Sequence, residues 1–149
     1  MFGEDRTTRV GIEGEAFTID GRATYEGREF EGHSIEGRLF NARMIQALFD
    51  DENGKTIDNW AYPDTGVYDP ERNVAEFIAA IPAWYEHGLR AVTVNLQCGS
   101  PEGYSDSQPW TVSAFRPDGS LKPAWLDRLQ RVLDRADDLG MVVILGLFY

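Results

Sequence analysis

Aromatic rings, amides and carboxylates are concentrated in stretches that we expect to be loops. A sugar presents apolar C–H faces surrounded by hydroxyl groups, so its binding site needs flat rings beside fixed hydrogen-bonding groups. Taken singly, each aromatic residue is more often a cap on the hydrophobic core than a ligand contact. The candidate rings are Trp60, Tyr62, Tyr68, Tyr104 and Trp110, with Asp64, Asn95, Gln97 and Gln108 nearby in sequence.

Asn95 and Gln97 are the strongest polar candidates. They alternate along the β-rich run Ala91–Gln97, so a strand would place both side chains on one face, beside its carboxyl end. In α/β folds, active sites are built at this end of the strands. We therefore predict that both residues contribute to a carbohydrate-binding site.

Three motifs resemble cofactor, metal or nucleophile sites but have the wrong spacing. Gly54-Lys55-Thr56 lacks the earlier glycine of a phosphate-binding loop, because Phe49 occupies that position. The turn 50–54 lacks the last carboxylate of a calcium loop, and nothing places a histidine beside Cys98. We expect no cofactor, no metal site and a solvated turn at 50–54.

Net charge excludes several classes of partner. The chain of 149 residues carries a net charge of −11, whereas nucleic acids and anionic membranes require basic surfaces. The N-terminus lacks the basic and apolar regions of a signal peptide, and no apolar run approaches the ~20 residues of a membrane span. The sequence therefore predicts a cytoplasmic protein that binds neither nucleic acid nor membrane.

The first half of the chain is punctuated by glycines. Residues 1–16 are polar and predict a loose lead-in, followed by a hairpin over Phe17–Tyr25 with its turn at Asp20-Gly21. Leu39–Phe49 fits a strand and a short helix equally well. This half therefore predicts one hairpin and leaves the second element undecided.

The second half predicts alternating helices and strands. A helix is expected from Asn73 to Gly88, with a kink or restart at Pro82, and a second from Pro123 to Gly140. The loop 98–120 between strand and helix is long enough to suggest a functional role. A parallel strand–helix–strand unit is thus expected over 91–149.

The final run, Met141–Tyr149, is apolar almost throughout. A strand that is apolar on both faces is typical of a parallel sheet covered on both sides. We therefore expect this strand to be covered in a fold that continues beyond it, while the chain alone would expose an open sheet edge and an uncovered apolar face.

Two segments resemble cellulase-like glycoside hydrolases. Phe17-Thr18-Ile19-Asp20-Gly21-Arg22 is similar to their opening hairpin, and Asp118-Gly119-Ser120-Leu121 with Ala136–Leu145 resembles their second helix and third strand. The resemblance implies an α/β fold, a (β/α)₈ TIM barrel, with residues 17–149 as its incomplete N-terminal domain. Leu39–Phe49, Ala91–Gln97 and Met141–Tyr149 would be the first three strands of a barrel of ~250 residues or more.

The resemblance also carries expectations for the site. It places Asp50, Asn95, Gln97, Tyr149 and the 98–115 loop at the sugar-binding face. The two catalytic carboxylates of this family follow the fourth and seventh strands, so they would lie beyond Tyr149. The chain would then be a glycoside hydrolase fragment, inactive alone, whose partner is the remainder of the barrel.

Two alternatives stay open. One is a barrel enzyme of different chemistry, because a fold does not determine a function. The other is a complete small α/β module that binds carbohydrate without cleaving it. A sharp, reversible thermal transition would favour the module, because a barrel fragment would unfold broadly or aggregate.

Overall fold

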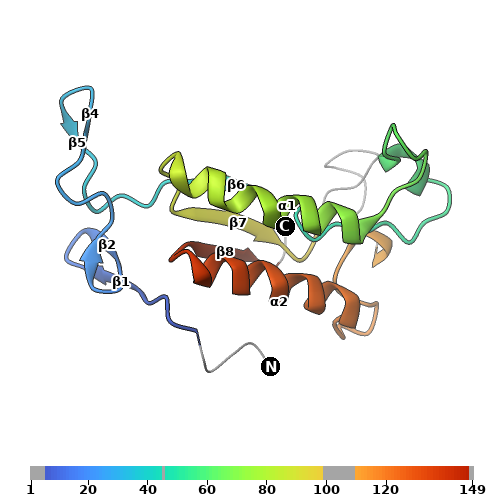
Figure 1. Ribbon diagram of the computed structural model, residues 1–149. Helices are drawn as coiled ribbons and strands as arrows, with labels where there is room; N and C mark the ends of the chain where they lie inside the picture. The colour runs from blue at the N-terminus through green and yellow to red at the C-terminus, as the bar shows by residue number, and fades with distance from the viewer. Residues whose placement is uncertain (1–5, 45, 99–109, 148–149) are drawn as a thin grey trace.

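The structure is a computed structural model that describes residues 6–44, 46–98 and 110–147. These residues form a parallel three-stranded sheet with two helices, and small antiparallel hairpins lie at one end of it (Figure 1). The described chain is therefore a small α/β domain with an N-terminal β extension.

The parallel sheet has the strand order β6-β7-β8. Val92 of the central strand lies in register with Ala42 on one side and Val143 on the other. The expected parallel pairing of the strands around residues 91 and 142 is confirmed. The strands are β6 (Asn41–Arg43), β7 (Ala91–Asn95) and β8 (Val142–Gly146).

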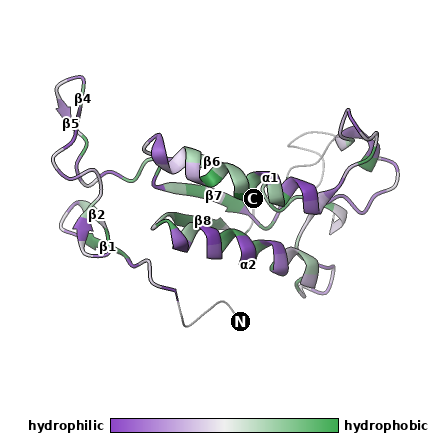
Figure 2. Ribbon diagram, viewed as in Figure 1, coloured by the Kyte–Doolittle hydropathy of each residue, from purple (hydrophilic) through white to green (hydrophobic). Residues whose placement is uncertain are grey.

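Helices α1 (Pro70–Glu86) and α2 (Pro123–Asp138) pass side by side over one face of this sheet (Figure 1). Figure 2 shows hydrophobic strands behind α2, whose outer surface is largely hydrophilic. The core joins β7 to α2 and α1 through buried side chains that include Val92, Val94, Trp125, Leu129 and Ile81.

The predicted start of the first helix is wrong. Asp69 is the N-cap, and its side chain accepts hydrogen bonds from the backbone N–H groups of Glu71 and Arg72. Pro70 therefore occupies the first helical position, where a proline lacks only an N–H that would have no partner within the helix. The helix runs through Pro82 to Glu86 without a restart.

The predicted (β/α)₈ barrel is wrong. The described residues form an open parallel sheet of three strands, with both of their helices on the same face, and they show no barrel fragment. Apolar strands joined through a helix occur in open α/β sheets as well as in barrels, because both cover parallel strands with helices. The sequence pattern therefore identified the α/β class but not the architecture.

The described part of 141–149, which ends at Leu147, is not covered on both faces, and an open edge with an exposed apolar face was expected of the chain alone. Among the described strands β8 has a neighbour on one side only, and Ile144 and Leu145 are each 38% exposed. The strand occupies Val142–Gly146, and Met141 precedes it as a buried residue.

The N-terminal hairpin is confirmed. β2 pairs with β3 across Asp20-Gly21, and both turn residues have positive φ, as the tight hairpin turn requires. The predicted lead-in over 1–16 is wrong in part, since β1 lies within it. The strands of this extension are β1 (Val10–Glu13), β2 (Ala16–Ile19), β3 (Arg22–Ala23), β4 (Glu29–Phe30) and β5 (His33–Ser34).

The undecided segment Leu39–Phe49 contains β6, followed by turns that bury Leu48 and Phe49. Two short 3₁₀ helices complete the elements, at Ile57–Trp60 and Trp110–Val112. The second lies inside the predicted long loop, of which residues 99–109 fall outside the described part.

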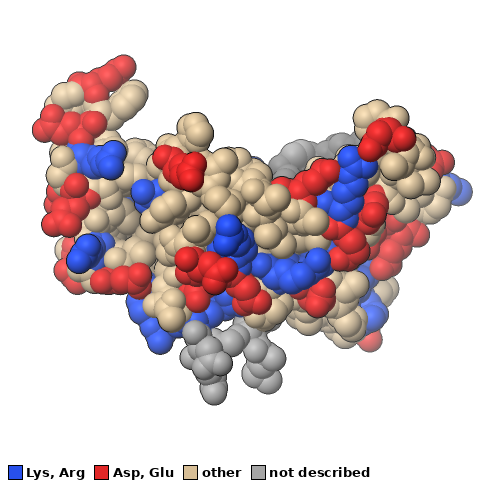
Figure 3. Space-filling model, viewed as in Figure 1, with Lys and Arg blue, Asp and Glu red and all other residues tan. Residues whose placement is uncertain are grey.

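Charged side chains of both signs are interspersed over the helix face in Figure 3. Several of these side chains form ion pairs, either between the two helices, as Arg131 does with Glu71, or within one helix, as Arg131 does with Asp127. In the ranges that the structure describes, no helix has the length and apolar content needed to cross a membrane. The same ranges contain no group of three or more His, Cys, Asp or Glu residues that could hold a metal ion.

Candidate functional site

A cavity of about 400 Å³ lies beside the N-terminus of α2. We call it the Trp110 cavity, because the Trp110 ring is 46% exposed at its wall. Among the described residues, it combines one aromatic ring with a carboxylate, two cations and a hydroxyl group. Its lining residues are Glu52, Trp110, Thr111, Arg116, Pro117, Lys122, Pro123 and Ala124.

Backbone pairing beyond β7 positions Trp110. Cys98 N–H donates to Val112 O at 3.3 Å, and Ala114 N–H donates to Leu96 O at 2.8 Å. Gln97 and Ser113 form an antiparallel bridge between these bonds. The segment that carries Trp110 is thereby held against the chain leaving the carboxyl end of β7.

A buried carboxylate positions Glu52. Asp51 is only 1% exposed, and it accepts hydrogen bonds from Thr56 Oγ1 at 2.6 Å and Trp60 Nε1 at 3.0 Å. The adjacent Glu52 N–H donates to Thr111 O at 3.0 Å, which joins this turn to the cavity wall. The turn predicted to be solvated is therefore anchored by Asp51, while the Glu52 side chain stays 53% exposed.

Lys122 joins the two walls of the cavity. Its Nζ donates to Glu52 Oε2 at 2.9 Å and to Trp110 O at 2.6 Å, and its side chain is only 9% exposed. A buried ammonium requires such partners, because burial without them is costly. Thr111 Oγ1 is buried in the same wall without a hydrogen-bond partner among the described residues.

Arg116 is the second cation of the cavity, on the turn that precedes α2. Its Nη1 donates to Leu121 O at 3.0 Å and to Ser120 Oγ at 3.3 Å. Asp118 lies in the same turn, and hydrogen bonds from the Ser120 side chain and backbone lower the pKa of its carboxyl group. Asp118 therefore carries its charge on the solvent side of this turn.

Of the predicted ligand residues, Trp110 lines the cavity, whereas Trp60, Tyr62 and Asp64 lie in the segment that packs on α1. Trp60 donates to Asp51 and packs on Phe49 at a centroid distance of 4.7 Å. The Arg72 guanidinium covers the Tyr62 ring at 3.8 Å and binds Asp64. Its hydrogen bonds lower the pKa of Asp64.

The Tyr68 ring is also engaged in the fold. Its hydroxyl donates to Phe49 O at 2.8 Å. Burial, followed by the nearby charge of Asp50, raises the pKa of Tyr68. Asp50 itself pairs at 2.9 Å with Arg128, whose side chain is 1% exposed. Asp50 thus compensates a buried charge of α2, and Arg128 Nη1 still lacks a hydrogen-bond partner within the described part of the chain.

Asn95 and Gln97 do not line the Trp110 cavity. Asn95 is 5% exposed and covers Gly146, where an added Cβ would lie 2.3 Å from Asn95 Oδ1. Gln97 is half-buried in its bridge with Ser113. Tyr104, Gln108 and Tyr149 lie outside the described residues.

Cys98 is buried at the end of the β7 segment. Burial raises the pKa of its thiol to about 12. The thiol therefore stays protonated near neutral pH, which disfavours a role as a nucleophile.

Sequence reasoning missed Glu52, Arg116 and Lys122 of the described cavity lining, whereas Thr111 lies in the 98–115 loop that the resemblance placed at the site. Lys122 stands directly before the first proline of a helix, at the positive end of the helix dipole, where a cation is unfavourable by itself. This position was a signal that Lys122 has a negative partner elsewhere in the fold. Its pairing with Glu52 spans 70 positions of sequence, so spacing gave no indication of it.

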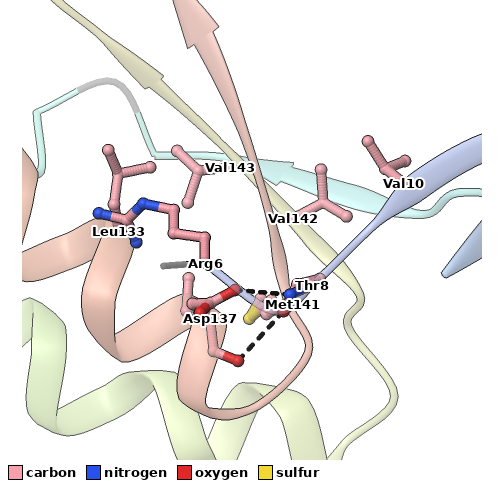
Figure 4. A pocket seen from close by; sticks show the side chains of 9 residues that line it. Arg6, Thr8, Val10, Leu133, Asp137, Met141, Val142 and Val143 are labelled. Atoms are coloured by element: carbon pink, nitrogen blue, oxygen red, sulfur yellow. Dashed lines mark hydrogen bonds between the residues drawn. The ribbon is translucent and has the colours of Figure 1, made fainter. Parts of the chain in front are cut away.

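A second cavity, of about 170 Å³, lies where the N-terminal segment crosses the end of α2 (Figure 4). Thr7 N–H and Thr8 N–H donate to the two carboxylate oxygens of Asp137 at 3.0 and 2.8 Å. Val142 and Val143 of β8 form part of its apolar wall. This cavity thus lies under the segment that crosses the start of β8.

Comparisons of the chain with protein-family models, curated proteins and solved structures found no match. The resemblance to cellulase-like glycoside hydrolases therefore stays a prediction.

Proposed function

We propose that this chain binds a carbohydrate in the Trp110 cavity and does not cleave it. The exposed ring of Trp110 supports the proposal, because it stands beside groups that both donate and accept hydrogen bonds. A sugar would stack its C–H face on this ring while its hydroxyl groups meet Glu52 and Arg116. The cytoplasmic location stays a prediction.

The carboxylates favour binding over hydrolysis. Glycoside hydrolysis uses two carboxyl groups, about 5–10 Å apart, on opposite sides of the scissile bond. Among the described residues that line the cavity, Glu52 is the single carboxylate, and it pairs with Lys122. We therefore expect the 149-residue chain to retain bound oligosaccharides intact.

The test is calorimetric titration of the purified chain with a panel of neutral and acidic oligosaccharides. Trp110→Ala should weaken binding at least about tenfold, because truncation of a ring at the centre of a site removes most of its contact. Phe30→Ala is the matched control, since Phe30 is 66% exposed on β4 and lies outside this cavity.

Unchanged affinity in Trp110→Ala, or no binding to any sugar of the panel, would overturn the proposal. Prolonged incubation with each bound oligosaccharide, followed by chromatography, checks the second half of the proposal. Products that form with the wild-type chain and disappear in Glu52→Gln would show that the cavity performs catalysis.

A further inference from the structure

The Arg116 guanidinium is held in one orientation by its own turn. The turn is closed by Arg116 N–H to Ser120 O at 2.8 Å and by the bridge between Phe115 and Leu121. Gly119 has a φ of 82°, which glycine adopts without strain. Nη1 bonds to this turn, so the guanidinium is anchored through one of its nitrogen atoms.

The opposite edge of the same guanidinium remains available. Within the described part of the chain, Nε and Nη2 of Arg116 have no hydrogen-bond acceptor, and no carboxylate lies within the 4.0 Å of an ion pair. Two adjacent N–H groups on one planar edge match the two oxygens of a carboxylate. An anchored guanidinium also loses less side-chain entropy when it binds.

The other charged side chains in and beside the cavity already have partners. Lys122 and Glu52 neutralise each other at 2.9 Å. Asp118 attracts Arg116 electrostatically, but its Oδ1 accepts two hydrogen bonds from Ser120. The first turn of α2 adds partial positive charge, and Lys122 gives it no side-chain cap. Arg116 is thus the cation of this cavity that still lacks a counter-charge in contact.

We infer that the carbohydrate is acidic: a uronic acid whose carboxylate binds the Nε–Nη2 edge of Arg116 while its ring stacks on Trp110. This inference rests on the proposed function, since it specifies the sugar bound in the same cavity. The net charge of −11 repels long polyanions. Salt at physiological strength screens charges beyond about 8 Å, so contacts inside the cavity decide the binding of a short oligosaccharide.

The experiment compares two trisaccharides of the same linkage, one built from uronic acids and the other from the corresponding neutral hexoses. The wild-type chain should bind the uronate at least about tenfold more tightly, as expected for a charge-assisted bidentate contact. Arg116→Gln should abolish this preference, because it should weaken binding of the uronate far more than binding of the neutral sugar, whose hydroxyl groups the glutamine amide can still meet. Arg116→Lys should restore part of it, because lysine keeps the charge but not the planar edge.

Arg22→Gln is the matched control, because it removes an arginine of the exposed strand β3 that does not line the cavity. Equal affinity of the wild-type chain for both sugars, or a preference that survives Arg116→Gln, would overturn the inference. In either case, the proposed function would still hold if the neutral sugar binds and its binding depends on Trp110. Failure of both sugars to bind the wild-type chain would overturn both.

Discussion

Strands β7 and β8 are neighbours of similar composition, yet they lie in different environments. Val94 of β7 and Leu145 of β8 are register partners, but Val94 is fully buried and Leu145 is 38% exposed. β7 lies between two strands, whereas β8 has one described neighbour. Apolar composition thus indicates a strand, while its position in the sheet determines how much of it is covered.

The largest expected effect is a difference in the free energy of unfolding between variants in which one or the other of these register partners is truncated. Val94→Ala should lower the free energy of unfolding by about 2 kcal/mol, because it leaves a cavity in a close-packed core. Leu145→Ala deletes a larger group but should cost less than about 1 kcal/mol, because much of that group already contacts solvent. Urea denaturation measures both, and equal costs would show that β8 is covered in solution.

A smaller effect is expected where the two strands touch through Asn95 and Gly146. Gly146→Ala should cost about 1–2 kcal/mol, because its new Cβ would overlap Asn95 Oδ1. Gly54→Ala is the matched control, since a Cβ there meets nothing within 4 Å.

Combining Gly146→Ala with Asn95→Ala should recover part of that loss by removing the overlapping group. A double-mutant cycle should then show a coupling energy of about 1 kcal/mol. Additive costs in the cycle would contradict the contact between the two strands.

The smallest effect concerns the N-terminal segment that crosses the start of β8. Backbone hydrogen bonds from Thr7 and Thr8 lower the pKa of Asp137. A lowered pKa in the folded state stabilises the fold above the unfolded-state pKa of about 3.9, and this stability is lost as pH falls through the folded-state pKa.

Asp137→Asn should therefore destabilise the chain at pH 7 by less than about 1 kcal/mol, since the group is partly exposed. The difference from wild type should shrink on acidification towards pH 3, as measured by denaturant unfolding. Asp138→Asn, whose side chain is 69% exposed, is the control and should show a smaller change. A constant difference at all pH values would contradict the role of the Asp137 charge.

Local sequence patterns predicted those elements that depend on local chemistry. Asp20-Gly21 identified a hairpin turn, and the spacing of leucines identified α2 almost to the residue. The N-cap Asp69 was missed, although Asp followed by Pro is itself a helix-start pattern. In each of these cases the decisive interactions connect residues that are close in sequence.

The candidate site was only partly predictable. Trp110 was chosen because an aromatic residue in a long loop suggests a ligand contact. Trp60 and Tyr62 met the same criterion, but in the structure they contact Asp51 and Arg72. Composition does not separate these cases, because the partners of a ring depend on how distant segments meet.

The sequence by itself determined that this chain forms parallel strands alternating with amphipathic helices, since periodicity and capping act within short stretches. It also determined the residue types that favour a sugar ligand. Only the tertiary structure decided that the sheet stays open and that Lys122 reaches Glu52 across 70 positions. Those features arise from contacts between distant segments, which local propensity does not specify.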